Sequence, residues 1–171
     1  MYFCELLKAK IQKKMKITLL VVGKTTDTLV ESLTNVYIKR LEHYLDFQFQ
    51  VIPELKNTKA MSEAEQKQRE GELILKTVPA GSRIVLLDEK GGEYTSVEFS
   101  QKISAYMNSG QKNVVFIIGG PYGFSPDVYK AAHEKLSLSK MTFSHQMVRA
   151  IFAEQLYRAM TILKGEPYHH S

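Results

Sequence analysis

NVVFIIGGPYG, residues 113–123, joins the most hydrophobic run of this chain to a turn rich in glycine. The run Asn113–Ile118 is typical of a strand buried on both faces of a sheet. Glycines after such a strand let the backbone approach a ligand closely, and ligands of open α/β sheets bind beyond the carboxyl ends of the strands. The spacing is not that of a dinucleotide-binding fingerprint, and no phosphate-binding Lys-Ser/Thr pair follows. A plain tight turn into a helix is therefore an equally good interpretation.

Strand and helix signals alternate on both sides of this segment. Apolar or alternating runs predict further strands at residues 16–22, 47–51 and 83–87. Helical periodicity and capping residues predict helices at residues 27–45, 62–76, 95–108, 125–134 and 145–164. Residues 88–94 and 136–144 are interpreted as irregular connections. The alternation predicts an α/β fold, with a mostly parallel sheet flanked by helices on both faces.

Length and composition indicate a globular protein of one domain, because 171 residues with 44% hydrophobic side chains suffice for a sizeable core. The formal charge is +5, but residues 1–14 contribute +3 of it, so charge alone says little about partners. The single cysteine, Cys4, excludes an intramolecular disulfide and fits a reducing, cytoplasmic location. No apolar run is long enough to span a membrane.

Residues 1–14 differ from the text that follows, since domain-like sequence begins at Met15 with MKITLLVVGK. We interpret residues 1–14 as an N-terminal extension, such as an upstream start or an added leader, and residues 15–171 as the single domain. A short helix is the alternative for the extension, because Leu6, Leu7 and Ile11 have helical spacing. The lysines in this segment argue against a signal peptide.

Two further segments could carry chemistry. The loop from Leu138 to Phe143 interleaves small polar with apolar residues, so it could offer backbone groups to a purine, although an ordinary loop with Ser144 as N-cap explains it as well. His145 and Arg149 lie one helical turn apart just after it, where they could face a phosphate or a base.

Tyr168 and His169 follow a helix that Gly165 and Pro167 end. They could stack on a nucleobase, or belong to an inert chain end. The two adjacent histidines lack a third ligand, so we expect no metal site.

These segments in this order resemble one family. The matching text is MKITLLVVGK, Leu87-Asp88, FIIGGPYG, LSLSKMTFSHQMVR, EQLYRA and GEPYHH, and it covers nearly everything from Met15 onward. The chain is similar to the ribosomal large-subunit pseudouridine methyltransferases, which belong to the SPOUT class of RNA methyltransferases. The long C-terminal text makes the resemblance specific. It departs at His170, where related chains commonly carry arginine or lysine, so one RNA-contacting charge is in doubt.

The resemblance implies an α/β sheet with a C-terminal trefoil knot, a homodimer, and S-adenosylmethionine bound in the knotted loops. It also implies methylation of position N3 of a pseudouridine in 23S ribosomal RNA, with the large subunit or whole ribosome as partner. By matching positions, the cofactor contacts fall on Leu87, Gly119, Leu138, Ser139, Lys140, Met141, Thr142 and Phe143.

The catalytic candidates are His145, Arg149, Tyr168 and His169. His145 or His169 could accept the imide proton, because neutral histidine is available near pH 7. Arg149 could stabilise the imide anion or bind a phosphate, and Tyr168 could orient the base by stacking, with the Tyr168-His169 segment completing the site across the dimer. Two competing hypotheses are a non-catalytic RNA-docking dimer on the ribosome and a doubly wound nucleotide hydrolase. The hydrolase lacks a phosphate-loop lysine.

Overall fold

The computed structural model describes residues 15–170, so the expected N-terminal extension and its helical alternative lie outside the described residues. Its centre is a sheet of five strands, all parallel, in the order β2-β1-β4-β3-β5. The strands are β1 (Lys16–Val22), β2 (Asp46–Ile52), β3 (Arg83–Glu93), β4 (Asn113–Ile118) and β5 (Glu134–Ser137). The predicted mostly parallel α/β sheet is therefore confirmed.

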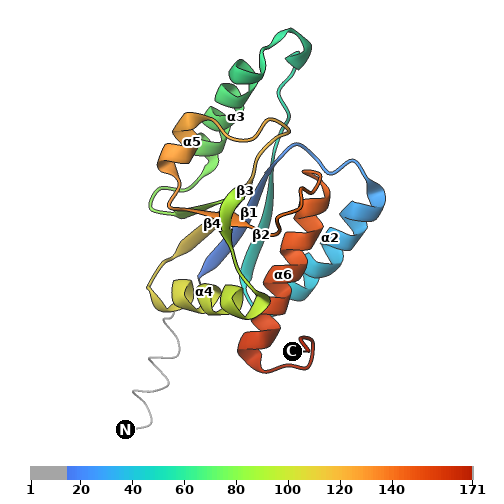
Figure 1. The fold of residues 1–171 in the computed structure, drawn as a ribbon, viewed down its shortest axis with the longest axis vertical. Helices are drawn as coiled ribbons and strands as arrows, with labels where there is room; N and C mark the ends of the chain where they lie inside the picture. The colour runs from blue at the N-terminus through green and yellow to red at the C-terminus, as the bar shows by residue number, and fades with distance from the viewer. Residues whose placement is uncertain (1–14, 171) are drawn as a thin grey trace.

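Three helices cover one face of the sheet: α2 (Thr28–Leu41), α4 (Ser96–Asn108) and α6 (Met147–Lys164). Figure 1 shows α6 lying alongside α2, with α4 across the lower end of the sheet. Alternate side chains of the central strands point to this face. Among them is Phe116 of β4, whose ring packs against those of Phe99 on α4 and Phe152 on α6. This larger apolar cluster fixes α6 on the sheet.

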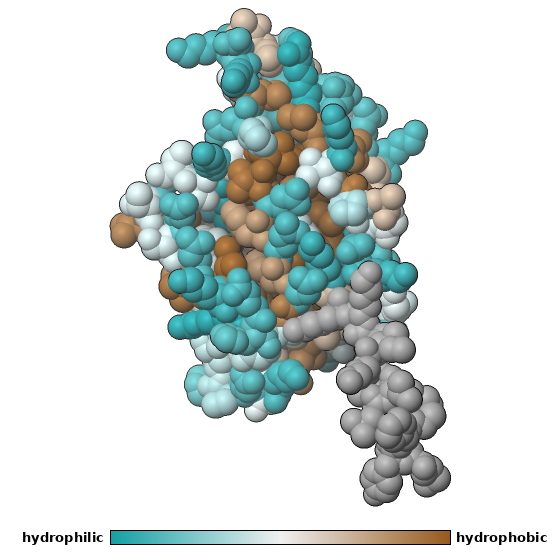
Figure 2. Space-filling model, turned by 180° about the vertical axis from the view of Figure 1, so that it is seen from behind, coloured by the Kyte–Doolittle hydropathy of each residue, from teal (hydrophilic) through white to brown (hydrophobic). Residues whose placement is uncertain are grey.

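The other face carries α3 (Glu63–Thr77) and α5 (Pro126–Ala131), which lie together at the upper end of the view in Figure 1. Ile74 and Val128 pack on the side chains of the intervening strand positions, such as Leu20 and Ile117. Seen from behind, hydrophobic side chains gather along the middle of the molecule, between hydrophilic flanks (Figure 2). Helices on both faces explain why the central strands are continuously apolar.

Local sequence signals explain where the helices begin and end. Asp27, Ser62, Thr95 and Ser125 are N-caps whose side chains accept backbone N–H groups of the first turn. Only at Thr95 is the capping box complete, because the Glu98 side chain accepts the Thr95 N–H in return. Gly165 ends α6 in the left-handed conformation that glycine tolerates.

Several predicted boundaries were wrong. Helix α2 ends at Leu41 rather than Leu45, and α6 begins at Met147 rather than His145. Strand β3 runs through the expected loop to Glu93, with an irregularity in its register after Leu87. The helix expected to reach residue 134 ends at Ala131, and β5 begins at Glu134.

The chain makes a long crossing between β5 and α6. Strand β5 lies at the edge of the sheet beside β3, whereas the start of α6 lies beside β1. There Gln146 accepts the backbone N–H groups of Thr26 and Asp27 through its side-chain oxygen. Residues 138–146 therefore pass the carboxyl ends of β3 and β4, the edge where a ligand site is expected.

Candidate functional site

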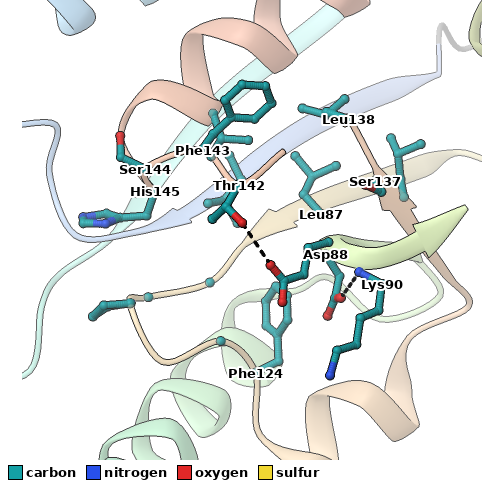
Figure 3. Close-up of a pocket in the computed structure, with 18 of the residues that line it drawn as sticks. Leu87, Asp88, Lys90, Phe124, Ser137, Leu138, Thr142, Phe143, Ser144 and His145 are labelled. Atoms are coloured by element: carbon teal, nitrogen blue, oxygen red, sulfur yellow. Dashed lines mark hydrogen bonds between the residues drawn. The ribbon is translucent and has the colours of Figure 1, made fainter. Parts of the chain in front are cut away.

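A cavity of about 600 Å³ lies at the carboxyl ends of β3, β4 and β5. Three segments enclose it: residues 87–90 of β3, residues 118–124 after β4, and residues 136–145 between β5 and α6. Figure 3 shows Thr142 and Phe143 entering from the α6 side, with Asp88 and Lys90 opposite them. The volume is within the usual range for small-molecule and cofactor sites.

The glycine turn forms one wall of this cavity. The Gly123 N–H donates to the Gly120 carbonyl at 3.1 Å, and Gly123 has a φ of 80°, which favours glycine. A Cβ at Gly119 would lie 3.0 Å from the Phe124 ring and 3.3 Å from the carbonyl oxygen of Gly123. A Cβ at Gly120 would lie 2.4 Å from Oε2 of Glu70. A side chain at Gly120 would force Glu70 to move, and one at Gly119 would need the Phe124 ring to give by a few tenths of an ångström, so close packing favours glycine at both positions.

The segment before α6 forms the facing wall, and its own polar side chains fix its shape. Ser137 donates its hydroxyl to the Ser139 carbonyl at 2.9 Å, and the Ser139 hydroxyl accepts the Met141 N–H at 2.9 Å. The Thr142 hydroxyl donates to the Glu89 carboxylate at 3.4 Å. These bonds leave apolar side chains as walls around backbone groups.

Seven of the eight residues expected to contact a cofactor line this cavity: Leu87, Gly119, Leu138, Ser139, Met141, Thr142 and Phe143. Lys140 does not line it, although it lies between two residues that do. The structure thus brings together segments that are up to 56 residues apart, as Leu87 and Phe143 are. Their contact with a cofactor stays a prediction.

Of the catalytic candidates, only His145 lines the cavity. Arg149 is fully buried instead, and its guanidinium donates hydrogen bonds to three backbone carbonyls and one hydroxyl. It donates at 2.9 Å to the carbonyls of Val22 and Gly23 and to the hydroxyl of Thr25. Burial lowers the pKa of Arg149, and the charge of Glu54 opposes that shift. In this structure Arg149 joins the start of α6 to the end of β1.

The C-terminal candidates lie against the middle turns of α6, because the chain folds back after Gly165. The Tyr168 ring packs edge-on against Tyr157, and its hydroxyl donates to Glu154 at 3.0 Å. Burial and the neighbouring hydroxyl of Tyr37 raise the pKa of Tyr168. Arg158 stacks over the Tyr168 ring. Glu154, Tyr157 and Arg158 come 7 to 11 residues after Met147, and each residue of a helix rises about 1.5 Å, so this cluster lies about 10–17 Å along α6 from the helix start.

His169 belongs to the same cluster, where its Nδ1 lies 3.4 Å from Arg158 Nη1. The Glu154–Arg158 pair, expected as a helix-stabilising ion pair, is formed at 2.5 Å. Arg158 thus connects α6 to the chain end, a role that helical spacing alone does not reveal. The four catalytic candidates therefore fall in two places within one chain.

Sequence reasoning missed several polar and aromatic residues of the cavity. Asp88 accepts the Lys90 N–H at 2.8 Å and the Tyr129 hydroxyl at 2.5 Å. Burial and this bond to Asp88 raise the pKa of Tyr129 to about 12. Phe124 supports the glycine turn from behind. The position of Asp88 directly after a buried run was the available signal, because side chains there reach the ligand edge of a sheet.

Two searches of residues 15–170 concern other classes of site. Within that range, no three histidine, cysteine or acidic side chains gather closely enough to hold a metal ion. None of the helices in the same range has the length and apolar character to cross a membrane.

An all-parallel sheet with its cavity between a glycine turn and the segment before the last helix is the arrangement of a ligand-binding α/β protein. A family described as predicted SPOUT methyltransferases matches residues 15–169 of this chain. The chain therefore belongs to the SPOUT methyltransferase family. A solved structure, a probable methyltransferase from Bordetella pertussis, has the same fold, with a TM-score of 0.53 and 12% identity over 90% of this chain and 99% of that one.

Several relatives that share one name are much more similar to this chain in sequence. A protein of Parabacteroides distasonis named ribosomal RNA large subunit methyltransferase H is 59% identical over 156 residues, which cover 91% of this chain and 99% of the relative. Proteins with the same name from Phocaeicola vulgatus and Flavobacterium johnsoniae are 59% and 53% identical over the same shares.

Proposed function

We propose that this chain is an S-adenosylmethionine-dependent methyltransferase that modifies N3 of a pseudouridine in 23S ribosomal RNA, on the large subunit or the assembled ribosome. The observation that carries the proposal is the 59% identity, over nearly the full length, to relatives named for this class of reaction. The resemblance of the C-terminal text supplies the pseudouridine and the position N3. Ribosomal RNA as substrate also fits a cytoplasmic location.

The cavity fits the proposed cofactor. Its volume of about 600 Å³, its apolar walls and the serine-fixed backbone of residues 137–141 suit an adenosine group. Gly119 and Gly120 let this wall pack closely on Phe124 and Glu70, because a Cβ at either position would meet one of those side chains. Leu87, Gly119 and the segment from Leu138 to Phe143 would hold the cofactor, with Lys140 the weakest member of the set. When bound, S-adenosylmethionine supplies an activated methyl group.

The protein would contribute alignment and removal of one proton. Holding donor and nitrogen in line can be worth about 7–11 kcal/mol. His145 lies at the cavity, so an imidazole nitrogen of His145 is the candidate to receive the imide proton. The buried Arg149 would act through position, because its bonds to β1 set where His145 and the helix start lie.

Tyr168 and His169 would contribute to the site of a second copy, since neither lines the cavity of its own chain and both are held against Glu154 and Arg158 on α6. An exposed apolar row on α2 supports a homodimer: Leu29, Leu33 and Val36 are 81%, 45% and 43% exposed. Met147 and Leu163 on the adjacent helix α6 are exposed as well. Apolar rows of this kind mark protein–protein contacts.

We also propose the trefoil knot. Residues 138–146 cross from the sheet edge at β5 to β1, past the strand end from which the glycine turn emerges. Threading of this crossing through the glycine turn and its neighbours would give the knot of the family. Such threading is otherwise nearly absent from proteins.

The test is methyl transfer from labelled S-adenosylmethionine to ribosomes that lack this modification, followed by nucleoside analysis. We expect label in N3-methylated pseudouridine, and more on ribosomes than on free ribosomal RNA run alongside. The matched control is the Gly119→Val variant, in which the added side chain disturbs the cavity wall at Gly119, so we expect it to transfer no label. A chain with no saturable affinity for S-adenosylmethionine would instead be the RNA-docking dimer.

A further inference from the structure

Glu70 on α3 is a buried carboxylate with one oxygen unused. The residue is 4% exposed, and its Oε1 accepts the side-chain N–H of Gln66 at 2.9 Å. Its Oε2 has no hydrogen-bond partner among residues 15–170. A buried polar atom left without a partner is uncommon and calls for an explanation.

The unused oxygen faces the wall of the cavity. Oε2 lies 2.4 Å from the place where a Cβ of Gly120 would be, and Gly120 lines the cavity. Next to it, a Cβ at Gly71 would lie 2.2 Å from the Ser125 hydroxyl. Helix α3 therefore presses directly on the back of the glycine turn, and only one layer of backbone separates the Glu70 carboxylate from the cavity.

No cation in the described part of the chain pairs with Glu70, since the ion pairs found there involve Glu65, Glu134 and Glu154. At the cavity rim, Asp88 and Glu89 stand beside Lys90. Salt and water screen such rim charges strongly. A charge behind a protein wall acts through a lower dielectric constant, so its effect on a ligand in the cavity is larger at the same distance.

We propose that the Glu70 carboxylate makes this cavity prefer the cationic sulfonium of S-adenosylmethionine over the neutral thioether of the demethylated product. The inference rests on the proposed function. The sulfonium loses its positive charge when the imide nitrogen forms a bond to the methyl carbon and the electron pair of the broken sulfur–carbon bond stays on the sulfur. An unpaired buried carboxylate nearby therefore stabilises the donor more than the product, which favours product release.

The test compares the dissociation constants of S-adenosylmethionine and S-adenosylhomocysteine by calorimetry for the wild type and Glu70→Gln. Glutamine keeps the shape and can still accept from Gln66, but it has no charge. We expect the preference for the cationic ligand to fall at least fivefold, which corresponds to about 1 kcal/mol. Glu72→Gln, an exposed glutamate on the same helix, is the matched control and should leave the preference unchanged.

The outcomes are distinct. A wild type that binds neither ligand overturns the proposed function itself. Wild-type binding with equal weakening of both ligands by Glu70→Gln, or with no change, overturns the role of Glu70 alone. If Glu70→Gln does not fold, the wild type is measured with an analogue that carries an ammonium group at the position of the methylsulfonium. Affinity for that analogue no higher than for S-adenosylhomocysteine would also overturn the inference.

Discussion

Replacing Arg149 by alanine tests whether this residue holds the fold together or acts on the substrate. The guanidinium is fully buried and donates to the carbonyls of Val22 and Gly23, each at 2.9 Å. Alanine would leave both carbonyls without a partner, at about 1–3 kcal/mol each. We therefore expect Arg149→Ala to lower the free energy of unfolding by about 2–6 kcal/mol.

The assay is thermal unfolding followed by circular dichroism at one fixed protein concentration. A domain of this size loses about 2–4 °C in Tm per kcal/mol, so the fall should be on the order of 10 °C. Arg69→Ala is the control, because the Arg69–Glu65 pair is exposed and such pairs contribute only about 0.3–0.5 kcal/mol. The Tm of Arg149→Lys should lie between those of the wild type and Arg149→Ala, since one ammonium group cannot replace all the hydrogen bonds of the guanidinium to Val22 and Gly23.

The refuting result is an Arg149→Ala variant that melts within about 2 °C of the wild type, a change below 1 kcal/mol. If that variant bound S-adenosylmethionine normally and still lost methyl transfer, Arg149 would act on the RNA, as its position in the sequence first suggested. Unfolding and binding measured on the same preparation separate the two roles.

Three more results are expected. Gly119→Val should abolish binding of S-adenosylmethionine in calorimetry while the far-ultraviolet spectrum stays native, because its Cβ would lie 3.0 Å from the Phe124 ring and its two methyl groups would displace that ring, which lines the same cavity; wild-type affinity would remove Gly119 from the site. Burial disfavours the charge of Glu134, but hydrogen bonds from Lys102 and its other partners outweigh this and lower its pKa. Its stabilising effect should therefore be full above the ordinary pKa of 4.5 and disappear as pH falls through the lower folded value. The Tm difference between wild type and Glu134→Gln should shrink in the same range, and a constant difference would contradict this. Thr95→Ala removes a capping-box hydroxyl and should cost about 1 kcal/mol in urea unfolding, whereas an unchanged midpoint would argue against the cap.

The sequence predicted those parts of the fold whose signals are local. Strands β1 and β4 were placed at their observed bounds because each is a short apolar run closed by glycine. Helix α4 followed from its complete capping box. Strand β5 was missed, because Glu134 and Lys135 carry no strand signal. Its stability comes from pairing with β3 and from the bond of Glu134 to Arg83, 51 residues away.

The candidate site divides in the same way. The glycine turn and the segment before α6 could be identified by their composition, and the sheet brings both to one cavity. Burial could not be predicted: Arg149 has the spacing of an exposed helix-start residue, yet it is enclosed by the end of β1. The apolar spacing of α2 was correct, but Leu29 is 81% exposed, since periodicity does not reveal whether the rest of the chain covers an apolar residue.

The bond between Arg149 and Gly23 joins positions 126 residues apart. At synthesis rates of about 5–20 residues per second, roughly 6–25 s separate the appearance of these two residues. Throughout that interval β1 of the nascent chain lacks the hydrogen bonds from Arg149 that fix its carboxyl end. The cavity proposed to hold the methyl donor is therefore assembled only once translation is nearly complete, and we expect a truncated product that ends before Arg149 to have no methyltransferase activity.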